Sequence, residues 1–140
     1  MVNLIIVCHG GLADGLLNAM ELIVGPQEGV VAIRLDEQDP IDQLETRIET
    51  AVQTRLAGQE VLILVDLFGA SPFNVSSRVA NRNPGVEVIT GANLPMLVET
   101  VLQRESASLK ELTAIAQEAG AASVKVLSKL MSPDGDPAVA

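Results

Sequence analysis

The apolar positions of the chain follow two alternating patterns. Short, uninterrupted apolar runs rich in β-branched residues predict strands that are covered on both faces. Between them, apolar residues recur every third or fourth position, as in helices that bury one face. The predicted strands are residues 2–8, 29–35, 61–65 and 86–90. Four alternations of strand and helix predict a doubly wound α/β domain.

This pattern predicts a single domain over residues 1–131, with a central, mainly parallel sheet in the order 2-1-3-4 and helices on both faces. Residues 123–127 alternate valine with polar residues, which predicts a half-exposed C-terminal edge strand. Residues 132–140 are rich in proline, glycine and aspartate, and we expect them to form a disordered tail.

Three chemically useful groups are predicted to meet at the carboxyl edge of this sheet. His9 ends the first strand and Asp66 ends the third. Ser71, followed by proline, is typical of a helix N-cap. Ligands of such sheets bind where the strand order reverses, here between the first and third strands. We therefore expect these groups to share one crevice, with Gly69 and Ala70 keeping the intervening loop free of bulk.

Phosphoryl transfer is the chemistry that this grouping favours. A neutral imidazole is nucleophilic, and Asp66 could accept a hydrogen bond from one ring nitrogen of His9 and leave the other free to attack. The unpaired N–H groups of a helix start suit a phosphoryl group or another anion. Simpler interpretations remain open: a structural histidine, a loop-capping Asp66, and a Ser71 that only caps its helix.

Composition and charge narrow the classes of function. The net charge of -9 argues against nucleic acid as a partner. A single cysteine, Cys8, excludes an internal disulfide, and one histidine beside it in the same strand cannot chelate a metal with it. No Walker loop or GxGxxG motif is present. No apolar run is long enough to span a bilayer, so we expect a cytoplasmic protein.

The two aromatic residues, Phe68 and Phe73, flank the predicted crevice. If exposed, they would form an apolar rim for a protein partner, and the alternative is that one or both belong to the core. A Ser-His-Asp hydrolase also remains open, although the sequence around Ser71 lacks the second glycine of the G-x-S-x-G elbow.

Three stretches together resemble the IIA component of the mannose-type (mannose, fructose, sorbose) phosphoenolpyruvate-dependent sugar phosphotransferase system. They are IVCHG at residues 6–10, VDLFGASPFN at 65–74 and VITGANLPMLVET at 88–100. The pattern extends to about Leu127. Cys8 stands where a threonine is common in the family, and Ala70 where a glycine is common; neither departure removes a reactive group.

The resemblance implies a phosphoryl carrier. His9 would accept a phosphoryl group from the phosphocarrier protein HPr, on the ring nitrogen remote from the main chain, and pass it to a IIB component. Asp66 would hold the other ring nitrogen, and the helix start with Gly69, Ala70 and Ser71 would bind the phosphoryl oxygens. The partner interface is expected to include Phe68, Phe73, Pro95 and Met96.

The resemblance also implies a wider assembly. The family is typically a homodimer in which the last strand crosses to the partner's sheet. IIB would connect the chain to the membrane IIC/IID complex, so that a cytoplasmic protein is associated peripherally with the permease. No metal, nucleotide or other cofactor is expected. Since the sequence stops at Ala140, we expect the IIB component to be a separate protein.

Two alternatives to sugar transport stay open. One is the phosphoryl-donor subunit of a dihydroxyacetone kinase, which has the same fold and a histidine at the same place. The other is a regulatory module that binds an anion without turnover. The SPFN element at residues 71–74 favours the sugar-transport branch.

Overall fold

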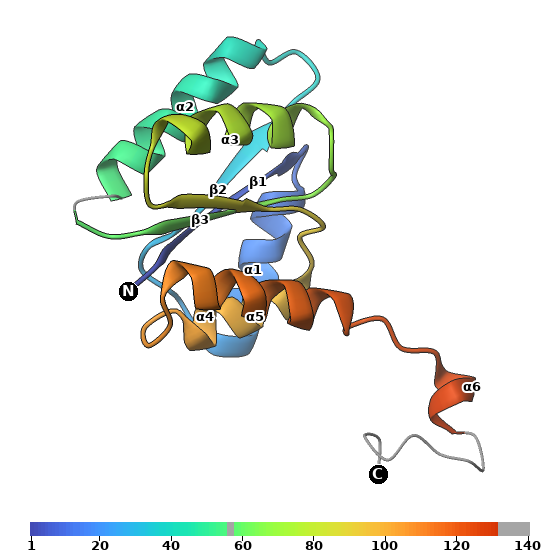
Figure 1. The fold of residues 1–140 in the computed structure, drawn as a ribbon. Helices are drawn as coiled ribbons and strands as arrows, with labels where there is room; N and C mark the ends of the chain where they lie inside the picture. Colours follow the sequence, from blue (N-terminus) through green and yellow to red (C-terminus); the bar gives the residue numbers. More distant parts are fainter. Residues whose placement is uncertain (56–57, 132–140) are drawn as a thin grey trace.

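The structure is a computed structural model that describes residues 1–55 and 58–131. Its four strands form one parallel sheet in the order β2-β1-β3-β4, so the predicted fold class and strand order are confirmed (Figure 1). The strands are β1 Asn3–His9, β2 Val30–Leu35, β3 Val61–Val65 and β4 Val86–Ile89. The helices are α1 Leu12–Val24, α2 Ile41–Arg55, α3 Ser71–Arg82, α4 Leu94–Gln103, α5 Leu109–Ala121 and α6 Leu127–Leu130. The predicted tail, residues 132–140, lies outside the described residues.

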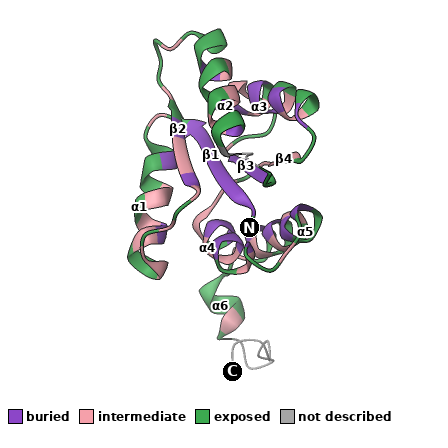
Figure 2. Cartoon of the chain, turned by 90° about the vertical axis from the view of Figure 1, so that its left-hand side faces the viewer, coloured by how far each residue is buried: buried purple, intermediate pink, exposed green. Residues whose placement is uncertain are grey.

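Helices cover the sheet on both faces. In Figure 1, α2 and α3 lie on one side of the strands, and α1, α4 and α5 lie on the other. Alternate residues of β1 enter two separate cores: Leu4 and Ile6 pack on the α1, α4 and α5 side, and Ile5 and Val7 pack on the α2 and α3 side. Figure 2 shows β1 buried along nearly its whole length. This double coverage explains why the strand is an unbroken apolar run in the sequence.

The parallel register places the carboxyl ends of β1 and β3 side by side at one edge of the sheet. Val7 lies opposite Val65 in the parallel ladder, so His9 and Asp66 emerge at the same level. From this point α1 leaves toward one face of the sheet and α3 toward the other. The crevice at the reversal of strand order therefore lies between these two chain segments, as the sequence predicts.

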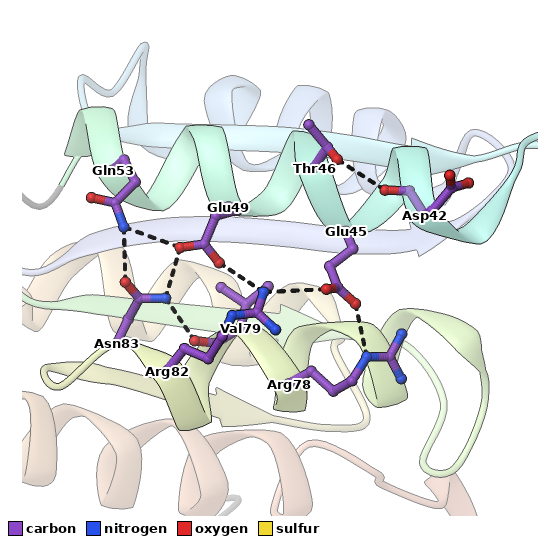
Figure 3. A network of polar contacts seen from close by, with 9 residues as sticks. All are labelled: Asp42, Glu45, Thr46, Glu49, Gln53, Arg78, Val79, Arg82 and Asn83. Atoms are coloured by element: carbon purple, nitrogen blue, oxygen red, sulfur yellow. Dashed lines mark hydrogen bonds and ion pairs between the residues drawn. The ribbon is translucent and has the colours of Figure 1, made fainter.

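Exposed ion pairs join α2 to α3 (Figure 3). Glu45 accepts a hydrogen bond from Arg78 at 2.7 Å and pairs with Arg82 at 3.2 Å, and Glu49 pairs with Arg82 at 3.0 Å. Such surface pairs contribute little to the free energy of unfolding. Their position does show that Arg78 is a structural charge, held on the flank of α3 against α2.

The predicted edge strand at residues 123–127 does not form in the single chain, and its pairing in a dimer stays a prediction. Residues 124–126 form no regular element and lead into the short helix α6, and this arm leaves the body of the domain (Figure 1). Val124 is 82% exposed. A strand needs a neighbour for its backbone hydrogen bonds, and in the described part of the chain β4 pairs only with β3.

Candidate functional site

The imidazole of His9 and the carboxylate of Asp66 meet at the carboxyl edge of the sheet. The Oδ2 atom of Asp66 lies 2.8 Å from Nδ1 of His9 and accepts a second hydrogen bond, also 2.8 Å, from the backbone N–H of His9. The His9 side chain is 49% exposed, whereas that of Asp66 is 11% exposed. The expected meeting of these two side chains is confirmed, with the histidine facing solvent and the acid behind it.

The Asp66 carboxylate fixes the tautomer of a neutral His9. An ionised carboxylate only accepts hydrogen bonds, so Nδ1 carries the proton and Nε2 keeps its lone pair. Burial would raise the pKa of Asp66, but hydrogen bonds from the backbone and ring of His9 outweigh it and hold the pKa below its ordinary value. The pair therefore presents an oriented imidazole whose nitrogen remote from the main chain is available for reaction.

The neighbouring thiol is not a competing nucleophile. Cys8 is fully buried in the core beneath the site. Burial, followed by the nearby charge of Asp66, raises the pKa of Cys8 to about 12. A thiol with such a pKa stays protonated at neutral pH, and the thiolate is the reactive form.

The start of α3 differs from the prediction. Ser71 was expected to be the N-cap, but it is the first helical residue, and Ala70 occupies the N-cap position with φ -85° and ψ 175°. No described side chain caps this helix. The loop before it turns at Gly69, whose φ of +82° is in the left-handed region that glycine adopts readily. The helix consequently begins with unpaired N–H groups at Ser71 and Phe73, because the proline between them has none.

Sequence reasoning assigned no role to Asn74. Its side-chain Nδ2 donates to the carbonyl oxygen of Gly69 at 3.1 Å, and its backbone N–H donates to the carbonyl oxygen of Ala70 at 2.9 Å. Asn74 thus contacts the loop between Asp66 and α3 through two hydrogen bonds. The sequence signal that could have indicated a role for Asn74 was its position in the SPFN element, residues 71–74.

The residues expected to face a partner are not equivalent. Phe68 is 74% exposed and packs against the half-buried Phe73, with 4.9 Å between ring centroids. Pro95 is exposed at the start of α4. Met96 is only 3% exposed, because it lies under α5 and packs against Gly120, so it offers almost no surface for a partner. Phe68, Phe73 and Met96 line a hollow of about 590 Å³ beside β4.

A second hollow, of about 370 Å³, adjoins His9 itself. Its acidic lining is Asp36, Glu37 and Asp39, and its apolar lining includes Ile41. Two of these acidic residues pair with arginines: Asp36 pairs with Arg34, and Asp39 pairs with Arg47. Among the described residues, no lysine or arginine contacts His9 or Asp66. The described residues therefore place no positively charged side chain in contact with His9.

Within residues 1–55 and 58–131, no group of three or more His, Cys, Asp or Glu side chains is arranged to hold a metal ion. Over the same ranges, no helix has both the length and the apolar character needed to cross a membrane.

Comparison with known proteins agrees with this geometry. The chain is 37% identical over 127 residues to a protein of Escherichia coli K12 described as a mannose-specific EIIAB component of the PTS system; the match covers 90% of this chain but 39% of that protein. It is 30% identical over 112 residues to the fructose-specific EIIA component of Bacillus subtilis 168, covering 80% of this chain and 77% of that protein.

A solved structure shows the same fold. The phosphotransferase system component EIIA from Streptococcus agalactiae superposes with a TM-score of 0.80 at 33% identity, over 91% of this chain and 98% of that one. The family model described as PTS system fructose IIA component, EIIA-man, matches residues 3–117. This chain therefore belongs to the mannose-type IIA family of the sugar phosphotransferase system.

Proposed function

We propose that the protein is a phosphoryl carrier that accepts a phosphoryl group on His9 from phosphorylated HPr and passes it to a IIB component during sugar uptake. The observation that carries this proposal is the 2.8 Å contact between His9 Nδ1 and Asp66 Oδ2, which leaves Nε2 of the 49% exposed His9 side chain free to react. Family membership supports the identity of donor and acceptor, because IIA components are phosphotransferase proteins of this system.

The transfer step follows from the tautomer. The Nε2 lone pair of His9 attacks phosphorus, the bond between phosphorus and the donor's nitrogen breaks, and its electron pair returns to the donor imidazole. The proton on Nδ1 stays in its hydrogen bond to Asp66, which stabilises the positive charge that develops on the ring. The second transfer, to IIB, is the same exchange with the roles reversed.

The start of α3 provides for the phosphoryl oxygens. The unpaired N–H groups of its first turn and the positive end of its dipole favour an anion there. We assign these contacts to the backbone of the loop and first turn, residues 69–71, with the Ser71 hydroxyl as a further donor. Because the described residues place no lysine or arginine in contact with His9, we assign the stabilisation from this chain to backbone N–H groups.

The surroundings of His9 suit a partner with an apolar centre and a basic rim. Leu12, Leu67 and Phe68 are exposed large apolar residues close in sequence to His9 or Asp66, and the exposed Ile41 lines the hollow at His9. The acidic hollow of Asp36, Glu37 and Asp39 lies on one side of them. Apolar contacts bury surface, and complementary charge speeds association and selects the partner.

We further propose a homodimer in which residues 123–127 pair with the free edge of β4 in a second copy. Val124, Val126 and Leu127 of the arm are exposed, and no described strand pairs with the side of β4 opposite β3, next to the 590 Å³ hollow. Through IIB the carrier would reach the membrane IIC/IID complex, as a cytoplasmic protein associated peripherally with it. Sedimentation equilibrium tests the dimer; a monomer at micromolar concentration would rule it out.

Intact-mass measurement tests the carrier function. The wild-type chain and His9→Ala are incubated with phosphoenolpyruvate, enzyme I and HPr, and then with a IIB domain. The wild type should gain one phosphoryl group, which is labile in acid and leaves on addition of IIB, and His9→Ala should gain none. If the wild type gains nothing while the same donors phosphorylate a control IIA protein, the proposal is wrong. A group that stays on His9 would favour an anion-binding regulatory module.

A further inference from the structure

We propose that Asn74 is a positioning residue for phosphoryl transfer: it holds the loop of residues 67–70 so that the N–H groups at the start of α3 point toward the phosphoryl group. The inference rests on the proposed function of His9. It concerns a side chain that touches neither His9 nor Asp66 in the structure, and that acts through the backbone of the loop.

The loop has few other contacts that would hold its shape. Leu67, Phe68 and Gly69 are exposed. The hydrogen bond across the loop, from Ala70 N–H to the Leu67 carbonyl, is long at 3.5 Å. Within the described residues, the bond from Asn74 Nδ2 to the Gly69 carbonyl is the one side-chain hydrogen bond that this loop receives.

Asn74 fixes two consecutive peptide groups of the loop. Its side chain binds the Gly69 carbonyl, and its backbone N–H binds the Ala70 carbonyl. In a trans peptide group the C=O and the N–H of the next residue point in opposite directions. Holding both carbonyls against the helix therefore directs the N–H groups of Ala70 and Ser71 away from it. The Ser71 N–H is then available to an anion in front of the helix, and the Ala70 N–H is held only by its long bond to the Leu67 carbonyl.

The peptide group after Gly69 is the one most able to turn over. Glycine adopts positive and negative φ values with similar ease, so it does not by itself hold this peptide in one orientation. If the peptide flipped, the carbonyl oxygen of Gly69 would face the phosphoryl oxygens and repel them. The Asn74 side chain opposes that flip, whereas a capping side chain, which would also hold the helix start, would occupy the N–H groups themselves.

Substitution can separate the two hydrogen bonds of Asn74. The backbone bond to Ala70 survives any side chain except proline, whereas the bond to Gly69 needs a side-chain donor. Asn74→Ala and Asn74→Leu remove the donor, and Asn74→Gln keeps an amide on a stem one methylene longer. Asn81→Ala is a matched control, because Asn81 is an exposed asparagine on the same helix with no side-chain hydrogen bond to a described residue.

The experiment measures the saturated rate of phosphoryl transfer from phospho-HPr, the KM for phospho-HPr, and the urea midpoint for each variant. Loss of one neutral hydrogen bond should lower the saturated rate of Asn74→Ala and Asn74→Leu roughly five- to tenfold. The KM and the urea midpoint should stay close to wild type, because the side chain is exposed. Asn74→Gln should recover part of the rate, and Asn81→Ala should match the wild type.

A measurement without phosphate provides a second test. Backbone ¹⁵N relaxation of the unphosphorylated protein should show larger motion at residues 67–70 in Asn74→Ala than in the wild type and Asn81→Ala. Wild-type transfer rates and an equally rigid loop in Asn74→Ala would overturn the role of Asn74 and leave the carrier function standing. Equal losses in the Asn74 and Asn81 variants would also overturn it. Failure of the wild type to accept a phosphoryl group would overturn both proposals.

Discussion

Helices α3 and α4 begin with similar sequences, but only α4 has a side chain that caps its first turn. Each has a proline at its second position, Pro72 in α3 and Pro95 in α4, after which one N–H group of the first turn needs an acceptor. In α4 that group, on Met96, donates to the Asn93 side chain at 3.0 Å. In α3 the N-cap is Ala70, which has no acceptor to offer. The two starts thus differ by one capping side chain.

The same difference separates two further helices. α5 begins with a full capping box between Ser108 and Glu111, whereas α1, which follows His9, begins at Gly11 without a side-chain cap from the described residues. The uncapped starts of α1 and α3 follow the site residues, whereas the short helix α6, which also begins without a side-chain cap, lies on the C-terminal arm. A missing cap costs about 1 kcal/mol of stability. Its absence at α1 and α3 leaves first-turn N–H groups without a side-chain acceptor, which is what the anion binding proposed at this site requires.

Introducing a cap into α3 should have the largest effect. Ala70→Asp places a carboxylate where it can accept the Phe73 N–H, and it adds negative charge in front of the site. We expect phosphoryl transfer to His9 to fall by about 100-fold, comparable to losing a donor that stabilises a developing anion. The urea midpoint should rise, and the free energy of unfolding should increase by up to about 1 kcal/mol. A variant that is stabilised and fully active would contradict the comparison.

Removing the cap of α4 should lower the free energy of unfolding, whereas adding a cap to α3 should raise it. Asn93→Ala deletes the bond to Met96 and the donor bonds to the carbonyls of Gly91 and Gly120, so we expect the free energy of unfolding to fall by about 2 kcal/mol. At α3, Ser71→Ala removes no cap, and its stability should change by less than about 0.5 kcal/mol. Urea unfolding of both variants measures this contrast. Equal losses would show that Ser71 contributes to stability as a cap would.

The smallest expected effect is on the pH dependence of the free energy of unfolding. The pKa of Asp66 is lowered because hydrogen bonds from His9 outweigh its burial. A lowered folded-state pKa gives stability that is present above the unfolded pKa of about 4 and is lost as pH falls through the folded value. Urea unfolding between pH 6 and pH 3 should therefore show a shallower decline for Asp66→Asn than for the wild type. Parallel curves would mean that Asp66 makes no net contribution.

Several parts of this molecule could be predicted because their signals are local. The covered strands are continuous apolar runs, and their alternation with helices determines the parallel order that brings His9 beside Asp66. The caps of α4 and α5 were also predictable, since Asn93 and Ser108 have the right side chains at the right spacing. Each of these inferences depends on residues that are close in sequence or on topology rules with few exceptions.

Local sequence signals were insufficient where the structure of a segment depends on its contacts with other parts of the molecule. Ser71 has the residue type of an N-cap, but the chain turns at Gly69 and is held by Asn74, so the helix begins one residue earlier than the pattern indicates. Met96 shares a motif with exposed Pro95 and yet is buried, because α5 packs over it. The valine alternation of residues 123–127 suits a strand, but a single chain offers this arm no strand to pair with.

The sequence by itself determined the α/β architecture, the strand order and the placement of a histidine and a carboxylate at one sheet edge, because burial of apolar surface and short connections leave few alternatives. Only the tertiary structure decided which helix start lacks a side-chain cap, which carbonyls accept hydrogen bonds from Asn74, and which ring nitrogen of His9 contacts Asp66. Those features depend on the orientation of individual peptide and imidazole groups. Hydrogen bonds between residues that are distant in sequence, such as His9 and Asp66, set those orientations.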